Sequence, residues 1–145
     1  MKEGAVAFKL YMSEKIGGLD IDDNNILLQA FNKVAKMGVP VAVHAEDKKI
    51  LETKRKEMEK AGRKDMEAYL MIHPSEAEAQ AIRRITQLAK KCGVQVHFCH
   101  VSSAVGLSAF LKAKKAGLPV TCEVTPHHLL LSLDHLKRYV TLALA

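Results

Sequence analysis

Two stretches carry the pattern that decides the fold: Val94-Gln95-Val96-His97-Phe98-Cys99-His100-Val101 and Pro40-Val41-Ala42-Val43-His44-Ala45. Both are short and rich in valine, which is typical of strands buried in a parallel sheet. A charged helical stretch over 47–61 and a second helical stretch from Ser75 to Lys91 separate them. This alternation predicts parallel strands joined by a right-handed helical crossover.

The same alternation continues on both sides of these two strands. Further strands are expected over 5–12 and 120–125, and further helices over 24–37, 103–115 and 133–138. The order β-α-β-α-α-β-α-β-α fits either a doubly wound open sheet or part of a (β/α)8 barrel. A whole barrel needs roughly 250 residues. We therefore expect one α/β domain over residues 1–145, which as a barrel would be only partial.

The start of the helix expected from Ser75 has a recognisable local pattern. Ser75 is followed three residues later by Glu78, which matches a capping box. Gly93 follows the last residues of the helical pattern and is expected to end the helix.

Composition and charge exclude several classes of protein. The hydrophobic share of 48% and the charged share of 26% are ordinary for a globular protein. No apolar run approaches the roughly 20 residues that cross a bilayer, and no signal peptide is recognisable, so we expect a cytoplasmic protein that does not contact membranes. Three cysteines without CxxC spacing, Cys92, Cys99 and Cys122, argue against a disulfide framework.

The net charge of +6 would suit a nucleic-acid binder, but its distribution does not. The basic residues are spread over the expected helices, and acidic residues are interleaved with them over 46–67. Dispersed charge of this kind indicates solvated helix faces. We therefore expect no nucleic-acid partner.

Each expected strand carries a chemically capable residue near its carboxyl end, where sites form in parallel α/β folds. These are Lys9, His44, the group His97-Phe98-Cys99-His100, and Glu123. Imidazole and thiolate both suit zinc. Taken singly, Lys9 could reach solvent at a strand end, and His44 could be a hydrogen-bonded structural residue. The combination on successive strands favours a metal site.

Strand alternation raises one difficulty for such a site. His97 and Cys99 share one face of their strand, whereas His100 shares the other face with apolar neighbours. A bulge or the strand end must re-aim one of them if all are to serve one site. On the next strand, Glu123 is expected to face inward, and burial there would require a partner.

Four ordered motifs resemble the cyclic amidohydrolases, the group that includes dihydroorotase, allantoinase and hydantoinase. They lie at residues 8–12, 41–46, 97–103 and 118–129. The last, Leu118-Pro119-Val120-Thr121-Cys122-Glu123-Val124-Thr125-Pro126-His127-His128-Leu129, looks most like dihydroorotase, because its relatives usually have a tyrosine at the position of His128.

The resemblance implies a fold and a metal site. The fold would be a metal-dependent (β/α)8 barrel, of which this chain matches about strands 4 to 7 with their helices. Lys9 would be carboxylated and bridge two zinc ions, and His44 and His100 would bind the second zinc. Cys99 and Glu123 would support these ligands or hold an accessory metal.

The implied reaction is the reversible hydrolysis of dihydroorotate to N-carbamoyl-aspartate, a step of pyrimidine synthesis. The family's His-x-His pair and its last-strand aspartate have no counterpart among the 145 residues, so we expect no catalytic residue in this chain and negligible activity of the chain alone. Two alternatives stay open: another cyclic amidohydrolase of the allantoinase or hydantoinase type, or a non-catalytic assembly module on a decayed barrel. A partial barrel exposes strand edges, which predicts self-association or a completing chain segment.

Overall fold

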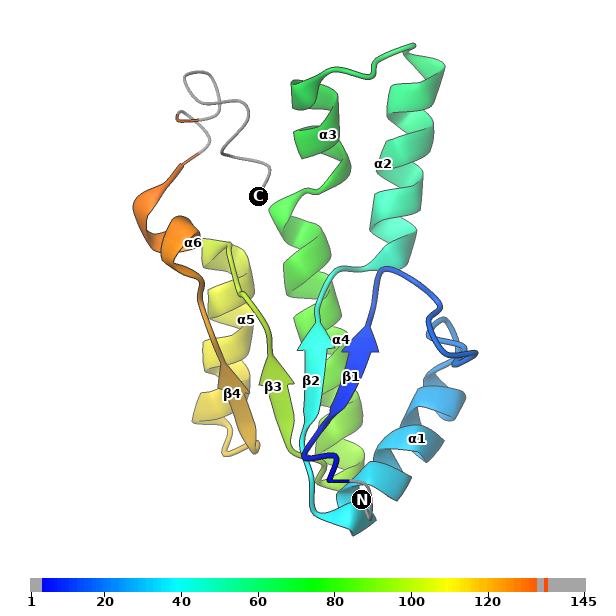
Figure 1. Cartoon of the computed structure of the whole chain (residues 1–145), viewed down its shortest axis with the longest axis vertical. Helices are drawn as coiled ribbons and strands as arrows, with labels where there is room; N and C mark the ends of the chain where they lie inside the picture. Colours follow the sequence, from blue (N-terminus) through cyan, green and yellow to red (C-terminus); the bar gives the residue numbers. More distant parts are fainter. Residues whose placement is uncertain (1–3, 133–134, 136–145) are drawn as a thin grey trace.

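The computed structural model describes residues 4–132 and 135, and its centre is a sheet of four parallel strands (Figure 1). The strands lie in chain order: β1 (Phe8–Tyr11), β2 (Val41–His44), β3 (Val96–Phe98) and β4 (Val120–Cys122). The register aligns Lys9 with Ala42, Ala42 with His97, and His97 with Thr121. The expected parallel α/β architecture is therefore confirmed.

The helices are α1 (Asn24–Met37), α2 (Lys48–Lys60), α3 (Met66–Ile72), α4 (Ser75–Cys92), α5 (Ala104–Lys115) and α6 (Pro126–Leu130). Figure 1 shows α4 and α5 behind the sheet, α1 beside the β1 edge, and α2 and α3 beyond the carboxyl ends of the strands. No helix of the described part covers the opposite face of the sheet. Nor is any helix in 4–132 both long and apolar enough to cross a membrane.

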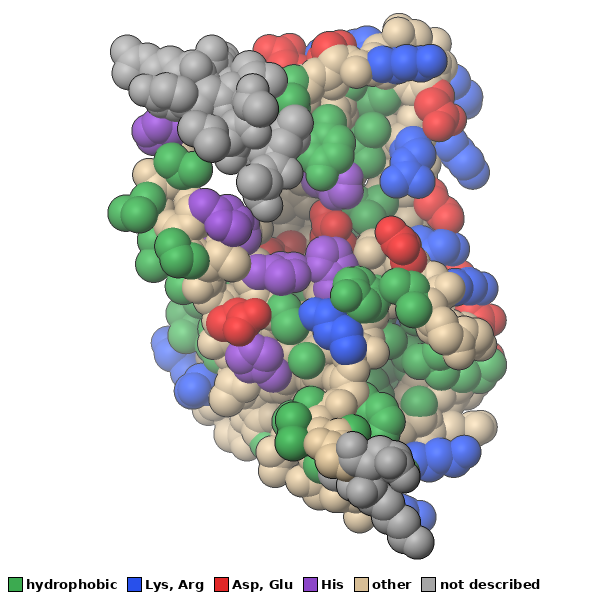
Figure 2. Space-filling model, in the orientation of Figure 1, with side chains coloured by type: hydrophobic (Ala, Val, Ile, Leu, Met, Phe, Trp, Pro, Cys, Tyr) green, Lys and Arg blue, Asp and Glu red, His purple; other side chains and the backbone are tan. Residues whose placement is uncertain are grey.

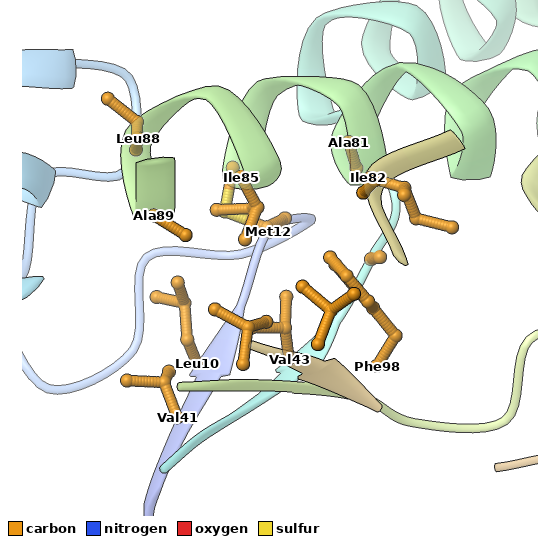
Figure 3. Close-up of a cluster of buried hydrophobic side chains, with 14 of the residues drawn as sticks. Leu10, Met12, Val41, Val43, Ala81, Ile82, Ile85, Leu88, Ala89 and Phe98 are labelled. Atoms are coloured by element: carbon orange, nitrogen blue, oxygen red, sulfur yellow. The ribbon is translucent and has the colours of Figure 1, made fainter. Parts of the chain in front are cut away.

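The core lies between the sheet and α4. Val43 and Phe98 from the strands and Ile82 and Ile85 from α4 are fully buried (Figure 3). Because successive strand side chains point to opposite faces, the alternate residues are directed to the uncovered face. Lys9 on that face is exposed.

Helix α1 is the element whose bounds match the sequence expectation at both ends. The Asp23 side chain accepts hydrogen bonds from the backbone N–H groups of Asn25 and Ile26, and so caps the helix. Gly38 ends it in the left-handed conformation, at φ 69°. The four strands are shorter than expected, and α3 and α6 had not been expected. The helix expected over 133–138 lies almost wholly outside the described residues.

The capping box expected at Ser75 and Glu78 is wrong. Pro74 is the N-cap of α4, Ser75 is the first helical residue, and no side chain caps the helix. Glu78 turns instead toward the loop after β3, where Ser102 and Ser103 offer both backbone and hydroxyl donors.

Strands β1 and β4 are the two edges of the described sheet. Each presents backbone groups that a further strand could pair with. Self-association or completion by another segment stays a prediction.

Truncating the core at α4 tests this packing. The Ile82 side chain is 0% exposed, so Ile82→Ala should lower the free energy of unfolding by about 2–5 kcal/mol through lost burial and an unfilled cavity. The control Ile16→Ala, at a side chain that is 52% exposed, should change it by less than about 0.5 kcal/mol. Urea unfolding followed by circular dichroism measures both, and equal effects would contradict the assigned core.

Candidate metal centre

Two histidines from neighbouring strands meet at the carboxyl end of the sheet. His44 is the last residue of β2, and His100 lies just beyond the end of β3. His44 Nδ1 lies 3.1 Å from His100 Nε2, and both residues are half-buried. Two nitrogens that share one tetrahedral zinc at the usual bond lengths lie roughly 3.3 Å apart. The spacing of this pair therefore fits a shared metal ion.

A left-handed backbone turn brings His100 into this site. Its φ is 40°, the one positive φ among the non-glycine residues that the structure describes. Cys99 N donates to Val43 O, and Val101 N donates to Glu123 O, so His100 sits between two sheet hydrogen bonds and leaves the regular pleat. This turn resolves the alternation conflict, because it redirects His100 from the apolar face to the open face.

Glu78 holds the loop that follows His100. Its buried carboxylate accepts hydrogen bonds from the backbone N–H and the hydroxyl of both Ser102 and Ser103, at 2.5–3.1 Å. Ser103 in turn caps α5 through the N–H of Gly106. The carboxylate thus joins α4 to the start of α5, directly beside the histidine pair.

Lys9 lies next to the histidine pair, not within it. Its Nζ donates to Cys99 Sγ at 2.9 Å and lies 5.1 Å from the centre of the Tyr11 ring. The Tyr11 ring in turn lies 5.6 Å from that of His44. Burial, and then repulsion from His44 and Lys9, lowers the pKa of His100, which favours the neutral form that can bind a metal.

A second cluster of possible ligand atoms lies on the same open face, at β3 and the ends of β3 and β4. One ligand atom each of His97, Cys99 and Glu123 falls within 4.8 Å of the others. His97 Nε2 is 3.3 Å from Glu123 Oε2, and His97 Nδ1 is 2.9 Å from Thr121 Oγ1. The hydrogen bond from His97 lowers the pKa of Glu123. The expected burial of Glu123 is wrong, because the face is uncovered, but the expected partner is present.

A cavity of about 720 Å³ opens over the histidine pair. Besides His44 and His100 its lining includes Arg55, Tyr69 and His128. Figure 2 shows histidine side chains gathered at the centre of this face, with acidic and basic side chains beside them. Burial lowers the pKa of His128, whose Nδ1 is buried and has no hydrogen-bond partner among the described residues. A volume of this size lies within the range of small-molecule binding sites.

Two residues of this site were missed by sequence reasoning. The Glu46 carboxylate lies 3.3 Å from His44 Nε2 through Oε2 and 2.7 Å from His73 Nδ1 through Oε1. Burial raises the pKa of Glu46, but the hydrogen bonds from the two histidines outweigh it and lower this pKa to about 2. The i, i+2 spacing of His44 and Glu46 was a usable signal, whereas nothing local marked His73.

Comparison with known proteins gives this arrangement a context. No family model matches the chain. It is 34% identical over 145 residues to an allantoinase of Escherichia coli O1:K1, covering 97% of this chain and 32% of that protein. Its homologues are cyclic amidohydrolases. The chain spans about a third of the length of these relatives.

Solved structures agree with this relationship. The L-hydantoinase (dihydropyrimidinase) of Arthrobacter aurescens is 33% identical with a TM-score of 0.85, over 94% of this chain and 31% of that one. The dihydropyrimidinase of Brevibacillus agri NCHU1002 is 27% identical with a TM-score of 0.84, over 93% and 29%. The four-stranded sheet and its helices therefore match part of an amidohydrolase barrel, as the sequence predicted. The resemblance to cyclic amidohydrolases is confirmed, and the narrower assignment to dihydroorotase is not shown.

The contact between Glu78 and the loop after His100 can be tested by stability. Glu78→Ala removes the acceptor for buried donors of Ser102 and Ser103. The variant should therefore lower the free energy of unfolding by about 2–4 kcal/mol. A Cβ added at Gly106 would clash with the Glu78 carboxylate, so Gly106→Ala should cost roughly 1–3 kcal/mol. The exposed control Ser108→Ala should change little.

The double variant separates this contact from a general effect of helix substitution. In the Glu78→Ala background the carboxylate is absent and only Ser103 Oγ, 2.9 Å from the added Cβ, stays close, so Gly106→Ala should cost less than in the parent chain. Additive losses in chemical unfolding would show that the two residues act independently.

Proposed function

We propose that this chain forms the part of a cyclic amidohydrolase that binds metal through Lys9, His44 and His100. The observation that carries the proposal is the spacing of 3.1 Å between His44 Nδ1 and His100 Nε2 at the carboxyl end of a parallel sheet. Similarity to an allantoinase and an L-hydantoinase over nearly the whole chain supports the proposal. When bound, zinc polarises an amide carbonyl and lowers the pKa of water.

Each residue of the proposed metal site has a separate role. His44 and His100 would supply neutral imidazole nitrogens. Lys9 would need its amine converted to a carbamate to serve as a ligand, as the family resemblance implies, and its exposed position on the open face leaves the amine accessible to CO2. Cys99, Glu123 and His97 would offer a sulfur, a carboxylate oxygen and an imidazole nitrogen, which suits an accessory metal.

The substrate class that we favour is the cyclic amide or ureide of the allantoinase and hydantoinase type. The relatives reported above carry these activities in their names. The cavity over the histidine pair would hold the ring, and Arg55 and Tyr69 line it on the side of α2 and α3. Binding there would place the ring beside His44 and His100.

Dihydroorotase is the second candidate, and one observation favours it. His128 lines the cavity, and its buried Nδ1 has no hydrogen-bond partner within residues 4–132 and 135. A tyrosine is usual at this position in the allantoinase and hydantoinase relatives. An unpaired imidazole could receive a hydrogen bond from a substrate or, once protonated, face a carboxylate.

Zinc content tests the metal site directly. Elemental mass spectrometry after dialysis should find about one zinc per chain, lost in the double variant His44→Ala and His100→Ala. The exposed control His127→Ala should retain it. Zinc that survives in the double variant but is lost in Cys99→Ser would place the metal at the accessory cluster, and a zinc-free chain would count against the proposed centre.

Ligand titration tests the substrate class. Hydantoin and allantoin should shift the NMR signals of the cavity histidines in the zinc-loaded chain at lower concentration than dihydroorotate. His128→Tyr should leave that order unchanged. Tighter binding of dihydroorotate, weakened at least tenfold by His128→Tyr, would favour dihydroorotase instead.

Turnover by the chain alone should be negligible, because no His-x-His pair occurs in it.

A further inference from the structure

The carboxylate of Glu46 connects two histidines that come from different elements. Glu46 follows β2, and its side chain is 21% exposed. Oε2 lies 3.3 Å from His44 Nε2, and Oε1 lies 2.7 Å from His73 Nδ1. Each oxygen therefore faces one imidazole ring.

This contact constrains the proton on His44. A neutral imidazole has one N–H donor and one nitrogen lone pair, and an ionised carboxylate only accepts hydrogen bonds. The acceptor-only carboxylate beside Nε2 therefore favours the tautomer with the proton on Nε2, whereas the contact with His100 alone is compatible with either tautomer. With the proton on Nε2, the lone pair is left on Nδ1, the atom that faces His100 Nε2 at 3.1 Å.

His73 fixes the carboxylate from its other side. It follows the last residue of α3, and its ring lies 4.7 Å from the ring of Tyr69 on the same helix. Its Nδ1–H donates to Glu46 Oε1, so the carboxylate is held between two rings and has little freedom to turn away from His44.

We propose that Glu46 is a positioning residue that selects the His44 tautomer with a free Nδ1 lone pair, and that His73 orients Glu46 for this task. The tautomer claim stands on geometry alone, whereas its value for metal binding rests on the proposed function. Partners that orient a metal-binding histidine in this way typically change metal affinity by about 10–100-fold when they are removed.

The first test is the tautomer in the metal-free chain. Long-range 1H–15N NMR correlations of histidine side chains, with His44 identified by its loss in His44→Gln, should show the proton of His44 on Nε2. In Glu46→Ala, the Nδ1–H form should become populated. The control Glu14→Ala removes a carboxylate from the lining of the same cavity and should leave the tautomer unchanged. A proton on Nδ1 in the parent chain would overturn the proposal without any variant.

The second test is zinc affinity, measured by competition with a chromophoric chelator. Glu46→Ala should weaken zinc binding by about 10–100-fold, with a smaller loss in His73→Ala and little change in Glu14→Ala. Unchanged affinity in Glu46→Ala would overturn the proposed role. If the parent chain binds no zinc, the metal site proposed above fails, and the tautomer measurement alone still decides the role of Glu46.

Discussion

The packing of α4 against one face of the sheet is the constraint on which the site depends. Ile82 and Ile85 bury the strand residues that point toward the helix, including Val43 and Phe98. Strand side chains alternate strictly, so this burial directs Lys9 and His44 to the opposite face. A slip of β2 by one residue would bury His44 and expose Val43, which gives the register a large energetic penalty.

Helix α4 also supports the loop that follows His100, the residue whose side chain strand alternation would direct to the apolar face. Glu78 lies on α4 near the isoleucines that build the core, and it holds Ser102 and Ser103 immediately after the turn at His100. One helix thus supports the sheet from behind and the loop at its end. The distance between His44 and His100 is a product of both contacts.

Much of the fold was accessible from the sequence, because short valine-rich strands and periodic helices are local signals. The predicted bounds of α1 agree with the structure because the caps observed there, Asp23 and Gly38, contact only near neighbours. The role of Glu78 could not be obtained this way, because its partners lie 24 and 25 residues away. Helix α3 was missed since its seven residues are too few for a clear period.

The site was predictable in part for the same reason. Lys9, His44 and the candidate ligands at the ends of β3 and β4 were singled out because parallel strands align their carboxyl ends. The structure places His44 beside His100, and metal binding by these residues stays a prediction. The approach of His73 to Glu46 depends on how α3 is placed, which no motif encodes. The choice between dihydroorotase and its relatives rested largely on His128, and one position is too little to separate enzymes that share a scaffold.

The left-handed turn at His100 narrows what can replace this residue during evolution. Glycine, asparagine and aspartate adopt such a φ with little strain, whereas β-branched residues do so rarely. Glycine would bring no ligand atom, but asparagine and aspartate would bring oxygen. The tolerated substitutions that keep a ligand atom, asparagine and aspartate, therefore offer oxygen. Oxygen ligands suit harder metal ions than imidazole does. For the proposed metal site, the backbone at this one residue therefore limits which metal ions a variant at this position could bind.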